Sequence, residues 1–156
     1  SLRRRQRQMC IRDSIVLCLS DGLLAQCGID LDTHRGEIAA GNLSALRGCP
    51  FVLGSAEDIG GRIGRGLLRS SGVSPVSKAT SENVETLLAL CEQGVGACFC
   101  PENLLHTALS PAQLAHLHIL PLCPEASYPI CFGYLSRSYP WSVLSEFIRI
   151  AREQTA

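Results

Sequence analysis

TSENVETLLALCEQGVGACFCP, residues 80–101, describes a helix that leads directly into a buried strand. Its apolar residues at positions 84, 87, 88 and 91 recur at helical spacing, and Ser81 stands where an N-cap residue is expected. Gly94 predicts the end of the helix. Residues 96–100 are too few for a helix and too apolar for a surface loop, so they predict a buried strand. A helix joined this closely to a strand is half of an α/β unit.

Strand and helix patterns alternate on both sides of this stretch, which predicts a mostly parallel sheet with helices on its faces. Residues 29–41 show weak periodicity and are expected to be irregular. Buried strands are expected at 15–20 and 49–53, and further strands are expected at 75–79, 117–122 and 130–135. A short helix or turn is expected at 23–27, and short helices are expected at 43–46 after Asn42, at 102–107 and at 112–115. A further helix is expected after Ser55, with the buried stripe Ile59, Ile63 and Leu67. The last helix is expected after Ser138 and Pro140, with the apolar stripe Trp141, Leu144, Ile148 and Ala151.

Composition indicates a globular protein of 156 residues, with 46% apolar and 18% charged residues. Residues 15–156 hold nine basic and thirteen acidic residues, which argues against nucleic-acid binding by this part of the chain. Apolar runs are too short for a membrane span, and the run at 15–19 is too short for a secretory signal, so a cytoplasmic location is expected. Nine cysteines without a CxxC pair suit reduced thiols better than disulfides.

Residues 1–14, SLRRRQRQMCIRDS, share no pattern with the rest of the chain. Their arginines would suit a basic arm that binds nucleic acid or a membrane surface. A disordered or foreign leader is the plainer interpretation, because MCIRDS resembles translated adaptor sequence. We therefore expect 1–14 to be a non-native or disordered leader and leave it out of the fold.

The sequence contains residues suited to three kinds of chemical site, but the spacing of the residues favours none of them. Cys98, Cys100, His116 and His118 have the atom types of a zinc site but lack the usual ligand turns. A cysteine nucleophile at 98 or 100 would lie in an apolar strand, where thiols are usually inert. The glycines at 60, 61, 64 and 66 match neither GxGxxG nor a Walker loop. We expect no catalytic residue, no metal and no cofactor.

Hydroxyl groups follow two of the expected strands. Ser55 and Ser81 each come shortly after a strand and before a helix, so both are expected at the carboxyl edge of the sheet. Either serine alone is as consistent with a helix cap as with a ligand contact. Two of them at one edge favour a site for a small molecule.

These segments together resemble the effector-binding domain of LysR-type transcriptional regulators. The resemblance is carried by PFVL at 50–53, by the pattern of helix, QGVG, apolar strand and proline over 81–101, and by the strand, YPW and terminal helix over 128–154. It covers about residues 15–154. It implies an α/β, two-lobed fold like type 2 periplasmic binding proteins, here with one lobe incomplete.

The resemblance also implies a domain plan and a site. Residues 15–48 would be a remnant of subdomain I, 49–127 would be subdomain II, and 128–156 would return to subdomain I. An effector would bind in the cleft between the lobes. The residues expected to face it are Leu53, Gly54, Ser55, Thr80, Ser81, Cys98, Phe99 and Pro101.

The function implied is sensing of a small-molecule effector by a homo-oligomeric bacterial regulator, without enzymatic turnover. DNA binding would need the family's N-terminal winged helix-turn-helix, which this sequence does not contain. The exposed apolar surface of an incomplete lobe would favour self-association or partial disorder. The alternative is a solute-binding protein of a transporter, which shares the fold but should carry an export signal. An enzyme is the third possibility.

Overall fold

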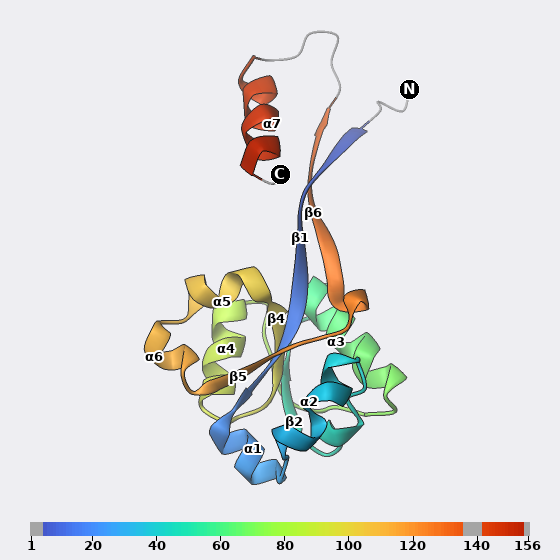
Figure 1. Cartoon of the computed structure of the whole chain (residues 1–156), viewed down its shortest axis with the longest axis vertical. Coiled ribbons are helices and arrows are strands. Elements are labelled where there is room, and N and C mark those ends of the chain that lie inside the picture. Colours follow the sequence, from blue (N-terminus) through green and yellow to red (C-terminus); the bar gives the residue numbers. More distant parts are fainter. Residues whose placement is uncertain (1–4, 136–141, 155–156) are drawn as a thin grey trace. The chain divides into compact units, whose positions relative to one another are not determined.

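The computed structural model of the chain describes residues 5–135 and 142–154 (Figure 1). The chain divides into two compact units, which are described separately below. The large unit comprises Ser14–Ser127, and the small unit comprises Ser1–Asp13 with Tyr128–Ala156. Strand β1 (Arg5–Ser20) contributes residues to both.

The large unit contains most of the helices and strands. After β1 they are α1 (Asp21–Cys27), α2 (Leu31–Ala39), the 3-10 helix η1 (Ser44–Leu46), β2 (Pro50–Leu53), α3 (Ile59–Ser70), β3 (Val76–Thr80), α4 (Val84–Glu92), β4 (Cys98–Pro101), α5 (Glu102–Ala108), α6 (Pro111–Leu114), β5 (Leu117–Pro121) and the 3-10 helix η2 (Pro124–Ala126).

Two sheets organise the large unit. β2 and β3 pair in parallel, and a parallel bridge between Phe51 and Ala97 brings the approach to β4 alongside β2. β1 lies between β4 and β5 and is antiparallel to both, with Cys18 opposite Cys98 and Leu17 opposite Leu120. The expectation of a mostly parallel sheet is therefore wrong. The alternation of strands and helices over 50–107 predicts only the parallel pair of β2 and β3. β1 precedes that segment in the chain, and its antiparallel pairing with β4 does not follow from the alternation.

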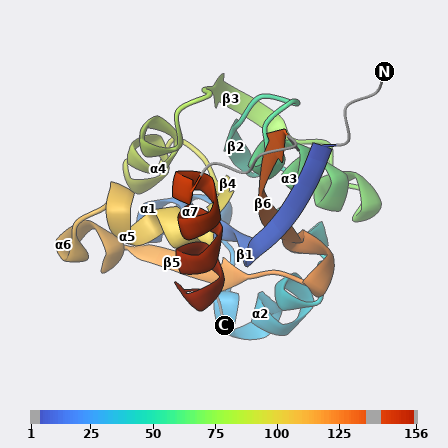
Figure 2. The ribbon, with the colours of Figure 1, turned by 90° about the horizontal axis from the view of Figure 1, so that it is seen from above.

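The helix and strand of residues 80–101 form as predicted. Leu87, Leu88 and Cys91 of α4 are buried, and they pack in one cluster with Cys98 and Cys100 of β4. After the helix, Gly94 has a φ of 75°, a conformation that glycine adopts without strain. α4 and α5 lie on one side of β4 and α3 lies on the other (Figures 1 and 2).

Helix α3 presents a face that the sequence pattern did not predict. Its buried positions are three glycines and Leu68, whereas the expected stripe at 59, 63 and 67 is only half-buried. The reason is close packing against β4: a Cβ atom on Gly64 would lie 2.3 Å from Cδ2 of Phe99. The Phe99 ring is in turn stacked on Phe51, with ring centroids 6.0 Å apart. These glycines therefore serve helix packing and not phosphate binding.

Two other segments differ from expectation. The segment expected to be irregular forms α2, because the Asp30 carboxylate caps it by accepting the Asp32 amide at 3.0 Å. Its periodicity is weak since only Leu31 and Ile38 are buried. β1 begins at Arg5, so residues 5–14 of the expected leader are part of a strand. Whether residues 1–14 are native to the protein stays a prediction.

The small unit contains the first half of β1, β6 (Ser127–Leu135) and α7 (Ser142–Gln154). β6 pairs with β1, and the Tyr128 hydroxyl donates a hydrogen bond to the Asp13 carboxylate at 2.8 Å. In α7, the predicted stripe of Leu144, Ile148 and Ala151 is half-buried, whereas residues 142, 143, 145–147, 149, 150 and 153 are exposed. The other predicted members, Ser138, Pro140 and Trp141, lie outside the described residues.

Candidate functional site

The carboxyl ends of β2 and β3 meet at one edge of the large unit. Leu53 is opposite Thr80 in the parallel pair, and the Ser81 amide donates to the Leu53 carbonyl at 3.2 Å. This pairing brings five of the eight predicted site residues together: Leu53, Gly54, Ser55, Thr80 and Ser81. We call residues 53–58 and 80–83 the candidate edge.

The caps of the two helices at this edge differ from the predicted ones. The Asp58 carboxylate caps α3 by accepting the Gly61 amide at 3.1 Å, and the Asn83 side chain caps α4 by accepting the Thr86 amide at 2.9 Å. Ser55 and Ser81 instead close the turns that precede the helices. Their hydroxyls accept the backbone amides of Asp58 at 3.2 Å and Asn83 at 3.1 Å. The expectation that these serines are N-caps is wrong, although Asp and Asn, which are preferred cap residues, were visible in the sequence.

Several polar groups at the candidate edge are free to meet a ligand. Thr80 is exposed, and no hydrogen bond of its hydroxyl occurs within the described chain. The same is true of the backbone amides of Ala56, Glu57 and Glu82. A cluster of hydroxyl and amide donors at a sheet edge suits recognition of a small molecule rich in hydrogen-bond acceptors. The exposed carboxylates of Glu57 and Glu82 add negative charge beside these donors.

The predicted β4 residues divide between two faces of the strand. Phe99 lies against the start of α3, which follows the candidate edge: its carbonyl oxygen lies 3.3 Å from where a Cβ on Gly60 would be. Cys98 faces the opposite way and is completely buried. Hydrogen bonds with Cys18 and Cys91, together with burial, raise the pKa of the Cys98 thiol. The expectation that the Cys98 side chain contacts an effector is therefore corrected: it is a core residue.

Pro101 occupies a structural position at the end of β4. It is buried at the end of β4, opposite Ile15 of β1, and directly precedes α5. Phe99 differs from Cys98 and Pro101 in packing against α3, where its ring lies against Gly64.

The zinc and nucleophile alternatives find no support in the large unit. Cys100 is completely buried, with its sulfur 3.6 Å from that of Cys18. Nε2 of His118 lies 2.6 Å from the Asp21 carboxylate, and His116 is exposed. Over the described parts of the chain, no three histidine, cysteine or acidic side chains gather in a metal-binding arrangement.

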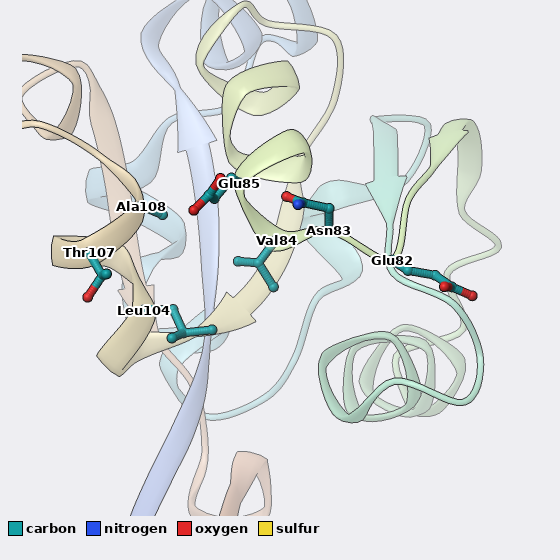
Figure 3. Close-up of a pocket in the computed structure, with 7 residues that line it drawn as sticks. All are labelled: Glu82, Asn83, Val84, Glu85, Leu104, Thr107 and Ala108. Carbon is teal, nitrogen blue, oxygen red and sulfur yellow. The ribbon is translucent and has the colours of Figure 1, made fainter.

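Two surface grooves of the large unit were not predicted from the sequence. The first has a volume of about 280 Å³ and lies between the start of α4 and α5 (Figure 3). Its apolar floor includes Val84 and Leu104, the latter 38% exposed. The second has a volume of about 360 Å³ and lies beside the last turns of α3. Neither includes the hydroxyl residues of the candidate edge.

Comparison with known proteins assigns the chain to a family. The sequence pattern of the LysR substrate binding domain matches residues 5–156. This chain belongs to the LysR substrate-binding domain family. The match begins ten residues before the resemblance noted from the sequence, at the residue where β1 starts.

Solved structures of LysR domains share the fold at low sequence identity. The regulatory domain of Synechocystis PCC6803 CcmR, in complex with 2-PG, has a TM-score of 0.72 at 12% identity, covering 99% of this chain and 69% of its own. The effector binding domain of QuiR, in complex with shikimate, has a TM-score of 0.67 at 11% identity, covering 97% and 65%. Full-length CbnR, complexed with its target DNA, has a TM-score of 0.58 at 16% identity, covering 97% and 46%.

These comparisons confirm the predicted fold class, because LysR effector-binding domains have the two-lobed fold of periplasmic binding proteins. The LysR substrate-binding domain described here spans about two thirds of the isolated effector domains and about half of the full-length regulator. The family assignment does not favour the transporter alternative. A comparison with curated protein sequences found no match. None of the described helices has the length and apolar character needed to cross a bilayer.

Proposed function

We propose that this LysR substrate-binding domain senses a small-molecule effector at the candidate edge. The observation that carries the proposal is the hydrogen bond from the Ser81 amide to the Leu53 carbonyl, which joins the ends of β2 and β3. It places the Thr80 and Ser55 hydroxyls and the starts of two helices at one sheet edge. Ligands of open α/β folds bind at the carboxyl ends of such strands.

The chemistry of related domains supports a small polar effector. The solved CcmR and QuiR domains are in complex with 2-PG and shikimate, respectively. 2-PG and shikimate are ligands of those two proteins. We infer the kind of effector that binds this chain from the residues of the candidate edge. Hydroxyl and amide donors favour a ligand with several acceptor oxygens, whereas Glu57 and Glu82 disfavour an anionic group placed directly against them.

The proposed output follows the logic of an allosteric regulator. An effector that binds one arrangement of the lobes better than another shifts the population toward that arrangement. We propose that residues 49–127 act as subdomain II, that 15–48 and 128–156 belong to subdomain I, and that homo-oligomers transmit the change to DNA in the cytoplasm. In the whole regulator, an N-terminal winged helix-turn-helix would contact the DNA. The role is regulatory and involves no chemical turnover.

A thermal-shift screen of polar metabolite-like compounds tests the proposal. Ligands that bind the folded state raise the midpoint in a concentration-dependent manner. The decisive variant is Thr80→Val, which removes an exposed hydroxyl and keeps the shape of the side chain. Thr86→Val on the exposed face of α4 is the matched control. We expect hits whose shift falls with Thr80→Val and persists with Thr86→Val. Shifts that survive Thr80→Val, Ser55→Ala and Ser81→Ala alike would refute the site.

A further inference from the structure

The second groove of the large unit is lined by two arginines. It has a volume of about 360 Å³, within the range of small-molecule sites, and lies between the end of α3 and the residues that follow it. Arg65 and Arg69 are four positions apart on α3, so both guanidinium groups project from the same side of the helix. The remaining lining residues are Gly72, Val73, Ser74 and Pro75.

The charge of this groove is not neutralised by the protein. Like charges at this spacing on a helix repel each other and destabilise the helix. Neither arginine takes part in an ion pair within the described part of the chain. A third guanidinium is close, since Nη2 of Arg47 lies 3.9 Å from where a Cβ on Gly72 would be. The large unit as a whole holds eleven acidic and six basic residues. These three arginines at or near the groove are therefore half of its basic residues.

Helix stability explains only part of this arrangement. Arg69 is in the last turn of α3, where a cation interacts favourably with the helix dipole. Arg65 is one turn earlier, and its Nη2 donates to the Gly54 carbonyl at 2.7 Å. That bond holds the guanidinium in position, while its other N–H donors have no partner in the described chain. Two guanidinium groups, one of them already fixed, thus present unused donors to a groove.

We propose that this groove binds a small dianion, either a phosphate group or a dicarboxylate. Guanidinium groups pair with the planar or tetrahedral oxygens of such anions through parallel, charge-assisted hydrogen bonds. Arg65 and Arg69 would share the anion, and Arg47 would add positive charge at the rim. The residues that line this groove are not those of the candidate edge, although Arg65 is hydrogen-bonded to the Gly54 carbonyl of that edge. The proposed ligand chemistry is different, and the proposal does not depend on the proposed effector function.

Calorimetric titration of the whole chain tests this site with two probes, inorganic phosphate and malonate. The titrations are run at pH 8 and constant ionic strength, with chloride as the balancing anion, because exposed charges are screened by salt. Arg69→Gln removes one of the two lining charges. Arg62→Gln makes the same change on an exposed position of the same helix that does not line the groove. Both variants remove exposed side chains, and circular dichroism checks that both are folded.

Saturable binding of one anion per chain is expected for at least one probe, and the probe that binds identifies the chemistry as phosphate or carboxylate. Loss of a charge-assisted contact should weaken that binding about tenfold in Arg69→Gln. Arg62→Gln should stay within about twofold of the parent chain, as expected of a single exposed charge. Absence of saturable binding to both probes, or equal weakening in the two variants, would overturn the proposal. Binding of duplex DNA in place of either small anion would also overturn it.

Discussion

Substitution of Gly64 by alanine isolates the packing of α3 on β4. The new Cβ would lie 2.3 Å from Cδ2 and 2.5 Å from Cγ of the Phe99 ring. Carbon atoms in contact are separated by about 3.5–4.0 Å, so the ring would have to move by roughly 1 Å or more. It has little room, because it is stacked on Phe51 and only 3% exposed. Overpacking of this kind costs about 1–3 kcal/mol.

Gly66→Ala is the matched control for this prediction. It lies on the same helix, is exposed, and its Cβ would meet no atom within 4 Å. Both substitutions gain the same helix propensity, about 1 kcal/mol. Subtracting one effect from the other therefore leaves the steric cost at Gly64. The expected difference in the free energy of unfolding is about 1–3 kcal/mol, with Gly66→Ala the more stable.

Urea unfolding, evaluated by linear extrapolation at unchanged m-value, measures the two free energies. The same pair of substitutions is then made in a Phe99→Leu background, where the smaller side chain leaves space for the new methyl group. The difference between Gly64→Ala and Gly66→Ala should shrink in that background. Equal stability of the two alanine variants in the parent chain would refute the packing argument.

Three further predictions concern caps and thiols. Asp58→Ala should destabilise the fold by about 1 kcal/mol in urea unfolding and cost more than Ser55→Ala, because only Asp58 caps α3; the reverse order would contradict the assignment. Burial, and then a hydrogen bond with Cys27, raise the pKa of Cys49 from 9.0 to about 12. The folded state thus favours the thiol, so its contribution is complete below pH 9.0 and is lost as pH rises toward 12; stability should fall less steeply over that range in Cys49→Ala. In native labelling with iodoacetamide followed by mass spectrometry, exposed Cys131 should react before Cys49, and simultaneous labelling would show that the burial is wrong.

The sequence predicted the elements whose pattern reflects their burial. The stripe of α4 could be read because Leu87, Leu88 and Cys91 pack in the core. A helix was predicted where α3 lies, but its buried face was not, since that face consists of three glycines and Leu68 and carries almost no hydrophobic pattern. α2 was missed for a related reason: with only two buried residues, its helix is signalled by the Asp30 cap and not by periodicity.

The pairing between strands was predicted only in part from the sequence. The parallel pair of β2 and β3 follows from the alternation of strand and helix. The antiparallel position of β1 depends on contacts between residues that are 80 or more positions apart in the chain. The residues predicted for the candidate edge were likewise placed correctly only in part. Its β2 and β3 residues were placed together as expected, and Cys98 was not, because alternate residues of a strand face opposite sides.

Hydrogen exchange with a bound effector shows whether the ligand lies at the candidate edge. A hit from the thermal-shift screen is added at saturating concentration, and amide exchange is followed by mass spectrometry at peptide resolution. Backbone amides that gain a ligand contact or lose access to solvent exchange more slowly. We expect slower exchange in peptides that cover residues 53–58 and 80–83. Unchanged exchange in both segments, with protection confined to other parts of the chain, would contradict it.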